Sequence, residues 1–397
     1  MIEEVTYQSF GSLLKKVIDN RGKTCPVTDS GMPLIATNCI SNNYLYPRYE
    51  NVRYVDQDTY KTWFRGHPEP GDMIFVLKGT PGRVAWVPNP IDFCIAQDMV
   101  SIRADEKKIY PKYLFAVLRS MPIQQEIEGL HVGTLIPHFK KGDFDDLKIP
   151  CVEADLQKFI GDQYFNLSLK IDLLHRQNKT LEAMAETLFR QWFVEEVGED
   201  WDEVTVGHFV ELNSASIDKN YTHETIEYLD TGSLNEGKIE GFQSLCLEEA
   251  PSRAKRLVRH NDILISTVRP DQKHYGIIKN PIENLVVSTG FCVLTCTRID
   301  PYFIYLLLTS SEMTEYLHTI AEGSTSTYPS LKPSDIGAIT FQRPPEDKLK
   351  EFANIANNVW GKIENNYFQM RTLEKMRDTL LPKLMSGEVR VKLEDAA

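Results

Sequence analysis

The sequence predicts an α+β protein in which two mixed α/β domains follow each other along the chain, each followed by a long helix. Three observations predict this fold class. One unit of sequence is written twice, short apolar runs alternate with turn residues in the first part of each copy, and a seven-residue apolar repeat closes each copy. The length of 397 residues, 42 % of them hydrophobic, is enough for about two to three separate domains.

The duplication is clearest in two segments of nine residues. Residues 180–188 read TLEAMAETL and residues 372–380 read TLEKMRDTL, so that Thr, Leu, Glu, Met, Thr and Leu recur 372 − 180 = 192 positions later. Other matches keep the same order at nearly the same offset, namely Gly71-Asp72-Met73-Ile74 with Asn261-Asp262-Ile263-Leu264, Asn89-Pro90-Ile91 with Asn280-Pro281-Ile282, and Pro137 and Asp143 with Pro329 and Asp335. A repeat of this length predicts whole domains rather than the short units of a solenoid.

The globular part of each copy is predicted from short β-branched and aromatic runs bounded by Gly, Pro, Asn and Asp. These runs lie at residues 73–77, 83–87, 262–266, 275–278 and 283–287. Residues 110–120 and 300–317 have helical character instead. We therefore expect a first domain over residues 1–150 and a second domain over residues 200–345.

The end of each copy carries an apolar heptad pattern, which is typical of a coiled coil. The positions at seven-residue spacing are Ile160, Leu167, Leu174, Leu181 and Leu188 in the first copy, and Phe352, Val359, Asn366, Leu373 and Leu380 in the second. A single stripe is also typical of a helix lying on its own domain. Two matched stripes favour helices that pack on each other, because a helix of about 37 residues is about 55 Å long and overhangs a domain of about 150 residues.

We therefore expect a central helix within residues 151–199 and a C-terminal helix within residues 346–397. If a twofold axis relates the two copies, these helices form an antiparallel coiled coil. Each stripe has one amide near its middle, Asn178 and Asn366, and an amide at such a position commonly fixes the register of a coiled coil. The two amides are predicted to lie close together.

Charge and composition argue against several classes of protein. The net charge of −12 argues against a chain that coats nucleic acid by bulk charge, although a local basic patch remains possible. No apolar run reaches the roughly 18 residues of a membrane helix and no secretion signal is visible, so we expect a soluble, cytoplasmic protein. The seven cysteines include no CxxC and the nine histidines no HExxH, so disulfides, a metal site and other cofactors are not expected.

Five segments of the sequence resemble the specificity (S) subunit of Type I restriction-modification enzymes. They are the helix ends TLEAMAETLFRQWFVE and TLEKMRDTLLPKLMSGEV, the opening GSLLKKVIDNRGKTC, the hairpin GDMIFVLKGTPGRVAWV and the segment IPHFKKGDFDDLKIP. The resemblance covers essentially the whole chain. It implies that the globular domains are two target-recognition domains, each reading one half of a bipartite, asymmetric target in double-stranded DNA.

The resemblance also implies partners. The helix pair would separate the two readers, two adenine-methyltransferase (M) subunits would dock beside the helices, and restriction/translocase (R) subunits would complete the complex. The chain itself would be a non-catalytic subunit. A modest basic content suits this role, because partner subunits can neutralise much of the phosphate charge.

Two loops at corresponding positions are candidates for contacting DNA. Glycines in the loop 78–83 (KGTPGR) allow close approach of the backbone, and its cations are suited to phosphate or guanine. An ordinary hairpin tip with solvated charges is the alternative interpretation. The candidate contacts are Lys78, Thr80 and Arg83 in this loop, and Thr267, Arg269 and Lys273 in the counterpart loop 267–274.

Further polar residues are weaker candidates for DNA contacts. They are Arg21, Lys23 and Thr24 near the start of the first domain, Thr134 and His138 before the first Pro-Asp segment, and Ser324, Thr325 and Tyr328 before the second. For the residues before the Pro-Asp segments, turn residues that cap a following element are at least as good an interpretation.

Catalytic motifs are weak in this sequence. The turn Asn89-Pro90-Ile91-Asp92 lacks the second proline and the aromatic residue of an amino-methyltransferase motif. Pro270-Asp271 with Glu346 and Lys348 is one formal match to a metal-dependent nuclease, but acidic residues at a helix start favour the helix dipole instead. The alternatives to a DNA-reading subunit are an autonomous restriction or methyltransferase enzyme with an unrecognised site, and a coiled-coil scaffold that binds proteins only.

Overall fold

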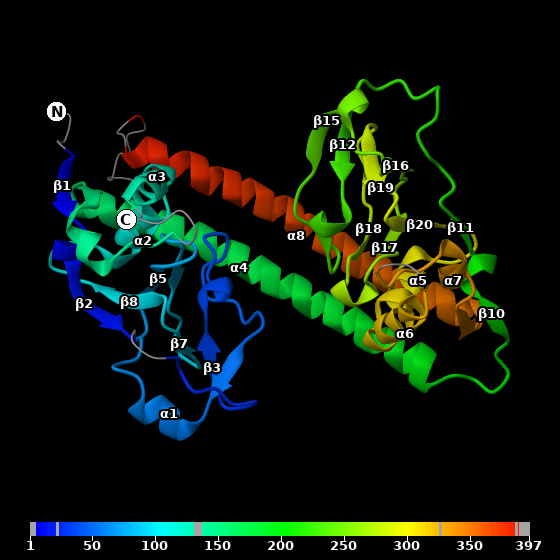
Figure 1. Ribbon diagram of the computed structural model, residues 1–397, viewed down its shortest axis with the longest axis horizontal. Coiled ribbons are helices and arrows are strands. Elements are labelled where there is room, and N and C mark those ends of the chain that lie inside the picture. Colours follow the sequence, from blue (N-terminus) through cyan, green and yellow to red (C-terminus); the bar gives the residue numbers. More distant parts are fainter. Residues whose placement is uncertain (1–4, 21–23, 131–136, 325–327, 386–387, 389–397) are drawn as a thin grey trace. The chain divides into compact units, whose positions relative to one another are not determined.

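The computed structural model describes residues 5–20, 24–130, 137–324, 328–385 and 388 (Figure 1). The chain divides into two compact units. The first unit comprises residues 1–178 and 364–397, and the second comprises residues 179–363. Each unit therefore contains one globular part and a segment of each of two long helices, α4 (Ala154–Arg190) and α8 (Glu346–Met385). None of the helices in the described residues is long and apolar enough to cross a membrane.

The globular part of the first unit is built on three small sheets. A four-stranded antiparallel sheet has the order β2 (Leu14–Asp19), β8 (Met99–Ala104), β5 (Met73–Val76), β6 (Val84–Trp86). A second sheet has the order β4 (Arg53–Val55), β3 (Met32–Ile35), β7 (Cys94–Ile95), and β1 (Thr6–Ser9) pairs with β9 (Lys148–Cys151). The helices are α1 (Gln57–Thr62), α2 (Pro111–Leu118) and α3 (Met121–Leu130), with short 3-10 turns at Gly11–Leu13, Thr37–Cys39 and Lys141–Asp145.

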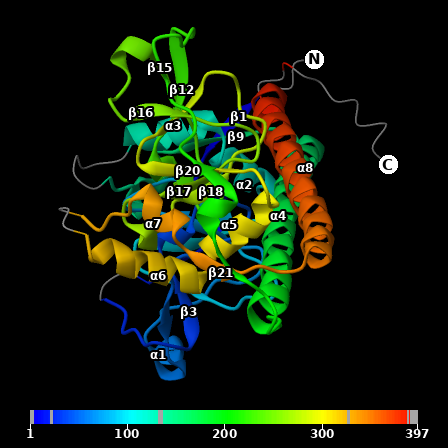
Figure 2. The same cartoon turned by 90° about the vertical axis from the view of Figure 1, so that its right-hand side faces the viewer.

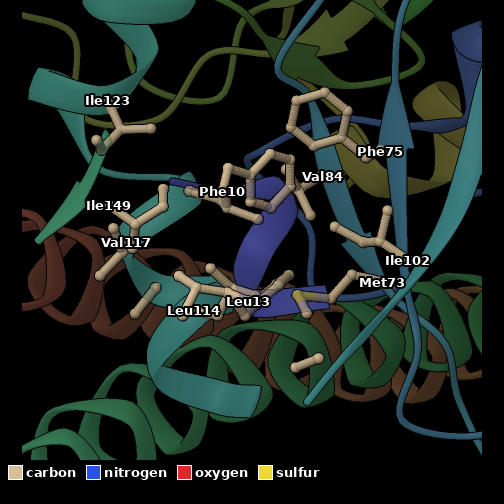
Figure 3. Close-up of a cluster of buried hydrophobic side chains, with 14 of the residues drawn as sticks. Phe10, Leu13, Met73, Phe75, Val84, Ile102, Leu114, Val117, Ile123 and Ile149 are labelled. Atoms are coloured by element: carbon tan, nitrogen blue, oxygen red, sulfur yellow. The ribbon is translucent and has the colours of Figure 1, made fainter. Parts of the chain in front are cut away.

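Strand β5 is central in the first unit because all four of its residues are buried. Its side chains alternate between two clusters, as successive residues of a strand point to opposite faces of the sheet. Met73 and Phe75 join the cluster under α2, where the Phe75 ring lies 5.6 Å from the Phe10 ring (Figure 3). Ile74 and Val76 face a separate cluster on the other side. Apolar layers on both faces explain why this run has no polar alternation.

The globular part of the second unit repeats this plan. Its first sheet has the order β11 (Val210–Leu212), β20 (Phe291–Cys296), β17 (Ile263–Ser266), β18 (Tyr275–Ile277). The second sheet has the order β15 (Gln243–Cys246), β12 (Thr225–Leu229), β19 (Leu285–Ser288), β16 (Ala254–Leu257). Two strand pairs complete it, β10 (Glu203–Thr205) with β21 (Thr340–Gln342) and β13 (Leu234–Asn235) with β14 (Lys238–Ile239). The helices are α5 (Pro301–Thr309), α6 (Ser311–Glu322) and α7 (Pro333–Gly337), with 3-10 turns at Val206–His208, Thr231–Ser233, Leu247–Glu249 and Pro270–Gln272, and a π-helical turn at Gln191–Glu195.

The repeated sequence motifs occupy matching places in the two units. Asp72 precedes β5 and Asp262 precedes β17, and both side chains are buried. Each carboxylate accepts a hydrogen bond from the backbone N–H three residues before it, and a second from a hydroxyl on the neighbouring strand, which belongs to Ser101 in the first unit and to Thr295 in the second. The Asp repeat seen in the sequence therefore marks a turn that leads into the central strand.

Within each unit, the segments of α4 and α8 lie side by side (Figures 1 and 2). In the first unit, Ile171 and Leu174 of α4 share a buried cluster with Met370 of α8. Asn366 Nδ2 donates a hydrogen bond of 2.7 Å to Asn178 Oδ1. The predicted contact between the two amides is thus confirmed.

The buried stripe departs from the strict heptad at several positions. On α8, Val359 and Leu373 are only partly buried, Leu380 is 38 % exposed, and Trp360 is buried in place of Val359. On α4, Ser168 is buried beside a partly buried Leu167. A straight helix has 3.6 residues per turn, so a seven-residue pattern drifts around it. Near its ends each helix also packs on a globular core, as Phe189 of α4 and Phe352 of α8 do in the second unit.

Candidate nucleic-acid interface

The first candidate loop, residues 77–83, is fastened to the segment that precedes the Pro-Asp motif. The Phe139 N–H donates to the Leu77 carbonyl at 2.9 Å, and the Gly79 N–H donates to the Pro137 carbonyl at 3.0 Å. Between these bonds Lys78 and His138 form an isolated antiparallel bridge. Two predicted contact residues that are 60 positions apart in sequence (138 − 78) are therefore brought next to each other.

The second candidate loop, residues 267–274, is fastened in the same way. The Leu331 N–H donates to the Thr267 carbonyl at 2.8 Å, and the Arg269 N–H donates to the Pro329 carbonyl at 3.0 Å. Val268 and Ser330 form the corresponding bridge. The backbone arrangement of the two loops is thus duplicated together with the sequence.

The two loops differ in the side chains that they present. Lys78 is exposed, whereas its counterpart in the second loop is the partly buried, uncharged Val268. In the second loop the guanidinium of Arg269 lies over the Tyr328 ring, 4.9 Å from its centroid, and Tyr328 is 55 % exposed. This Arg-Tyr pair joins two predicted residues in a flat group, a shape that suits stacking against a base or its sugar.

Arg83 has a different environment from the one predicted. The residue is partly buried, and its Nη1 donates to the Ile40 carbonyl at 3.4 Å. Val84, the next residue, pairs with Phe75 across the first loop, and Tyr275 pairs with Ile265 across the second. The paired residues are 84 − 75 = 9 positions apart in the first unit and 275 − 265 = 10 in the second, so the second loop is one residue longer. Arg83 therefore corresponds to His274. The side chain of Arg83 holds the base of the loop rather than its tip.

Several other predicted residues have structural contacts of their own. Lys273 forms an ion pair with Glu236 at 3.1 Å, and the Thr267 hydroxyl donates to the Gly290 carbonyl at 2.9 Å. Ser324 Oγ accepts a long hydrogen bond, 3.4 Å, from the Ser330 N–H. Thr80 is partly buried and Thr24 is exposed. Arg21, Lys23, Thr134 and Thr325 lie outside the described residues.

Gln124 of α3 is a contributor that the sequence did not reveal. Its Nε2 donates to the Gly82 carbonyl at 2.8 Å and to the Leu118 carbonyl at 2.6 Å, so α3 supports the first loop from below. A glutamine in an amphipathic helix carries no sequence signal for such a role. Only the packing of α3 against the loop identifies it.

The residues considered for nuclease chemistry have other contacts. Asp271 lies 3.3 Å from His318, Glu346 lies 3.8 Å from Lys350 one turn along α8, and Lys348 lies over the Trp201 ring. Among the described residues, no group of three or more His, Cys, Asp or Glu side chains is placed to hold a metal ion. The second loop therefore carries the acid Asp271 beside the cations Arg269 and Lys273, and the Asp271 carboxylate lies next to His318.

Comparison with known proteins finds a family model and relatives that are similar to this chain. A family model described as the Type I restriction modification DNA specificity domain matches residues 8–183. The Type I restriction enzyme HindI specificity subunit of Haemophilus influenzae is 29 % identical over 183 residues, which are 46 % of this chain and 40 % of that protein. The MjaIX specificity subunit of Methanocaldococcus jannaschii is 23 % identical over 338 residues, 76 % of each chain.

The fold has a counterpart among solved structures. The crystal structure of the S subunit of a Type I restriction-modification system from M. genitalium superposes with a TM-score of 0.57 at 17 % identity, over 96 % of both chains. The resemblance seen in the sequence is confirmed. Residues 8–183 match the model of the Type I DNA specificity domain, and the chain is similar in sequence to Type I specificity subunits.

Proposed function

We propose that this chain is the DNA-reading specificity subunit of a Type I restriction-modification complex and has no catalytic activity of its own. The observation that carries the proposal is the duplicated loop and bridge, Lys78 with His138 and Val268 with Ser330. One backbone frame presents different side chains in the two units, which is what a reader of two unlike half-sites requires. The named DNA specificity domain over residues 8–183 supports the same role.

The proposed architecture is a pair of tandem target-recognition domains, residues 1–150 and 200–345. Each is followed by a spacer helix, within 151–199 and 346–397, and the two helices form an antiparallel coiled coil. Contacts in both units support this pairing: in the first unit Tyr164 lies near Arg377 and Asn178 bonds to Asn366, so residue numbers rise along α4 while they fall along α8. In the second unit Phe189 of α4 contacts Phe352 of α8.

The proposed DNA contacts are the candidate residues of both loops and of the segments beside them, except Arg83, whose side chain bonds to the Ile40 carbonyl. Lys78 and His138 in the first unit, and Arg269 with Tyr328 in the second, are the strongest, because each pair is assembled from two distant segments. The proposed partners are double-stranded DNA, two adenine-methyltransferase subunits and restriction/translocase subunits. Since the target is cellular DNA, we place the protein in the cytoplasm.

The test is to express the chain together with methyltransferase subunits encoded beside it and to sequence the modified bases of the host DNA. We expect methylation at one split, asymmetric motif, and none when the chain is left out. Methylation or cleavage of DNA by the purified chain alone, supplied with Mg²⁺ and a methyl donor, would favour an autonomous enzyme. Methylation that does not depend on the chain would favour a protein scaffold.

A further inference from the structure

Lys140 and Lys332 occupy equivalent positions, each next to one of the two loops proposed to read DNA. Aligned at the offset of 192, residues 137–148 and 329–340 are identical only at Pro137 and Pro329, at Lys140 and Lys332, and at Asp143 and Asp335. Elsewhere in this segment the two copies differ, including at His138 and Ser330, which contact the loops. Each of the three shared residues needs a reason that holds in both units.

The structure supplies that reason for the aspartate, and it places the proline at a backbone contact shared by both units. The carbonyls of Pro137 and Pro329 accept the hydrogen bonds that fasten the two loops. The carboxylates of Asp143 and Asp335 accept a hydrogen bond from the backbone N–H three residues earlier, at 3.3 and 2.7 Å. The aspartate carboxylates therefore hold the backbone in both units, and the prolines stand where that backbone meets the loops.

The lysine ammonium groups have no such structural reason, because the bonds between each lysine and its aspartate at the start of the helical turn use the backbone atoms of the lysine. Lys140 and Lys332 are exposed, and neither has an ion-pair partner among the residues that the structure describes. Each follows directly after the residue whose N–H bonds to the reading loop, Phe139 in the first unit and Leu331 in the second. The capping aspartate fixes the backbone N–H of each lysine, so the two ammonium groups leave the fold from equivalent points beside the loops.

We propose that Lys140 and Lys332 bind the DNA phosphate backbone, one in each half of the target. This inference rests on the proposed function. Residues that read bases must differ between two unlike half-sites, whereas the phosphates are the same in both, so a residue kept in both readers suits a sequence-independent contact. A flexible ammonium is suited to phosphate as a point charge. The two lysines position the readers, while the loops select the sequence.

The test compares Lys140→Ala, Lys332→Ala and the double variant with the unchanged chain, each assembled with its methyltransferase partners. DNA affinity is measured at several salt concentrations on the cognate duplex and on a scrambled duplex. Each alanine is expected to lower affinity for both duplexes alike, on the order of fivefold at physiological salt, and to reduce the slope of log K against log salt by about 0.9. Lys140→Arg and Lys332→Arg should restore the slope, because they keep the charge.

Lys107→Ala provides a matched control. Lys107 is also exposed in the first unit, but it follows the far end of β8, a strand whose near end, Met99, pairs with Val76 next to the loop. A six-residue strand separates the two ends by roughly 17 Å. An unchanged slope for Lys140→Ala and Lys332→Ala, a loss equal to that of Lys107→Ala, or a loss confined to one base pair of the target would overturn the inference. Failure of the unchanged complex to select any sequence would instead overturn the proposed function.

Discussion

The two loops proposed to contact DNA, residues 78–83 and 267–274, occupy the same place in their units but form their turns by different means. The first loop turns at Gly79 and Gly82, which have φ values of +85° and +88°. In the second loop Arg269 and Lys273 have positive φ values, +48° and +55°, and each keeps a side-chain contact, with Tyr328 and with Glu236. Glycine adopts a positive φ at no steric cost, whereas the same backbone conformation at Arg269 and Lys273 is strained.

The comparison extends to the aspartates that begin the central strands. Asp72 receives a two-pronged ion pair from Arg103, at 2.7 and 3.1 Å, and this pair raises the pKa of the Arg103 guanidinium. Asp262 accepts its two hydrogen bonds from neutral donors, and burial raises its pKa. The duplicated frame is thus constant in backbone geometry but differs in charge. The two copies therefore hold the same turn with different side-chain partners.

The largest expected difference in the free energy of unfolding is between substitutions of Asp72 and of Asp262. Asp72→Asn removes the buried one of the two carboxylates that pair with Arg103, the other being Glu69 at 2.8 Å, and we expect it to lower the free energy of unfolding by about 2–3 kcal/mol. Asp262→Asn keeps the shape and an acceptor oxygen for neutral donors, so a loss below about 1 kcal/mol is expected. Urea denaturation of the full chain measures both. Equal losses would mean that the ion pair adds nothing to the shared turn.

The next effect concerns sequence choice in the two half-sites. Lys78→Ala should weaken recognition of one half-site and Arg269→Ala should weaken the other, by about 1–3 kcal/mol where the side chain meets a base edge. Competition binding with duplexes altered at single base pairs in either half measures this. Two variants that relax the same half-site would contradict a model with two readers.

Arg83→Ala is the matched variant for that experiment. Since its side chain bonds to the Ile40 carbonyl at the base of the first loop, we expect reduced stability with an unchanged order of preference among duplexes. A changed order of preference among duplexes would show that Arg83 contacts DNA.

Much of the fold was predictable because duplication left a trace in the sequence. Asp72 with Asp262 and Pro137 with Pro329 recur for backbone reasons, and the Asn178–Asn366 contact follows from two matched heptads. The role of Arg83 was not predictable, because the Ile40 carbonyl is brought to it only by the folding of a distant segment. Likewise no rule of spacing could place Tyr328 under Arg269.

A smaller effect on the free energy of unfolding, of about 1–2 kcal/mol, is expected at a glutamate position that occurs in both long helices, as Glu182 in α4 and Glu374 in α8. Glu182 of α4 lies near Glu186 and Glu236, and burial together with these charges raises its pKa to about 7 from 4.5. A carboxyl whose pKa is raised by folding contributes stability below its unfolded pKa and loses that contribution as the pH rises through its folded pKa. Unfolding free energy should therefore fall between about pH 4.5 and pH 7 on account of this group.

Glu182→Gln removes that charge, so we expect it to stabilise the chain at pH 8 and to flatten the profile. The matched variant is Glu374→Gln, at the same position of the repeated motif (182 + 192 = 374), where the neighbouring charge is Arg377. Loss of a favourable neighbour should leave this variant no more stable than the unchanged chain. Thermal unfolding at pH 5.5 and pH 8 separates the two, and stabilisation by both would show that the surroundings of Glu182 are not special.

The smallest effect tests the two ways of making the turn. A Cβ at Gly79 would meet nothing within 4 Å, so Gly79→Ala should cost only the strain of a positive φ, about 1 kcal/mol, with no steric clash. Lys273→Gly should relieve similar strain while losing an exposed ion pair with Glu236, a pair worth about 0–1 kcal/mol. We therefore expect Lys273→Gly to leave stability unchanged or to raise it slightly.

These two variants also separate loop geometry from loop chemistry in DNA binding. If Lys273 contributes its charge to binding, Lys273→Gly should weaken binding and its salt dependence while the protein stays as stable as before. Lys273→Asn serves as the control, because asparagine tolerates this backbone conformation and removes the charge without adding freedom to the chain. Binding that is lost in the glycine variant and kept in the asparagine variant would show that the second loop needs a stiff turn more than it needs the cation.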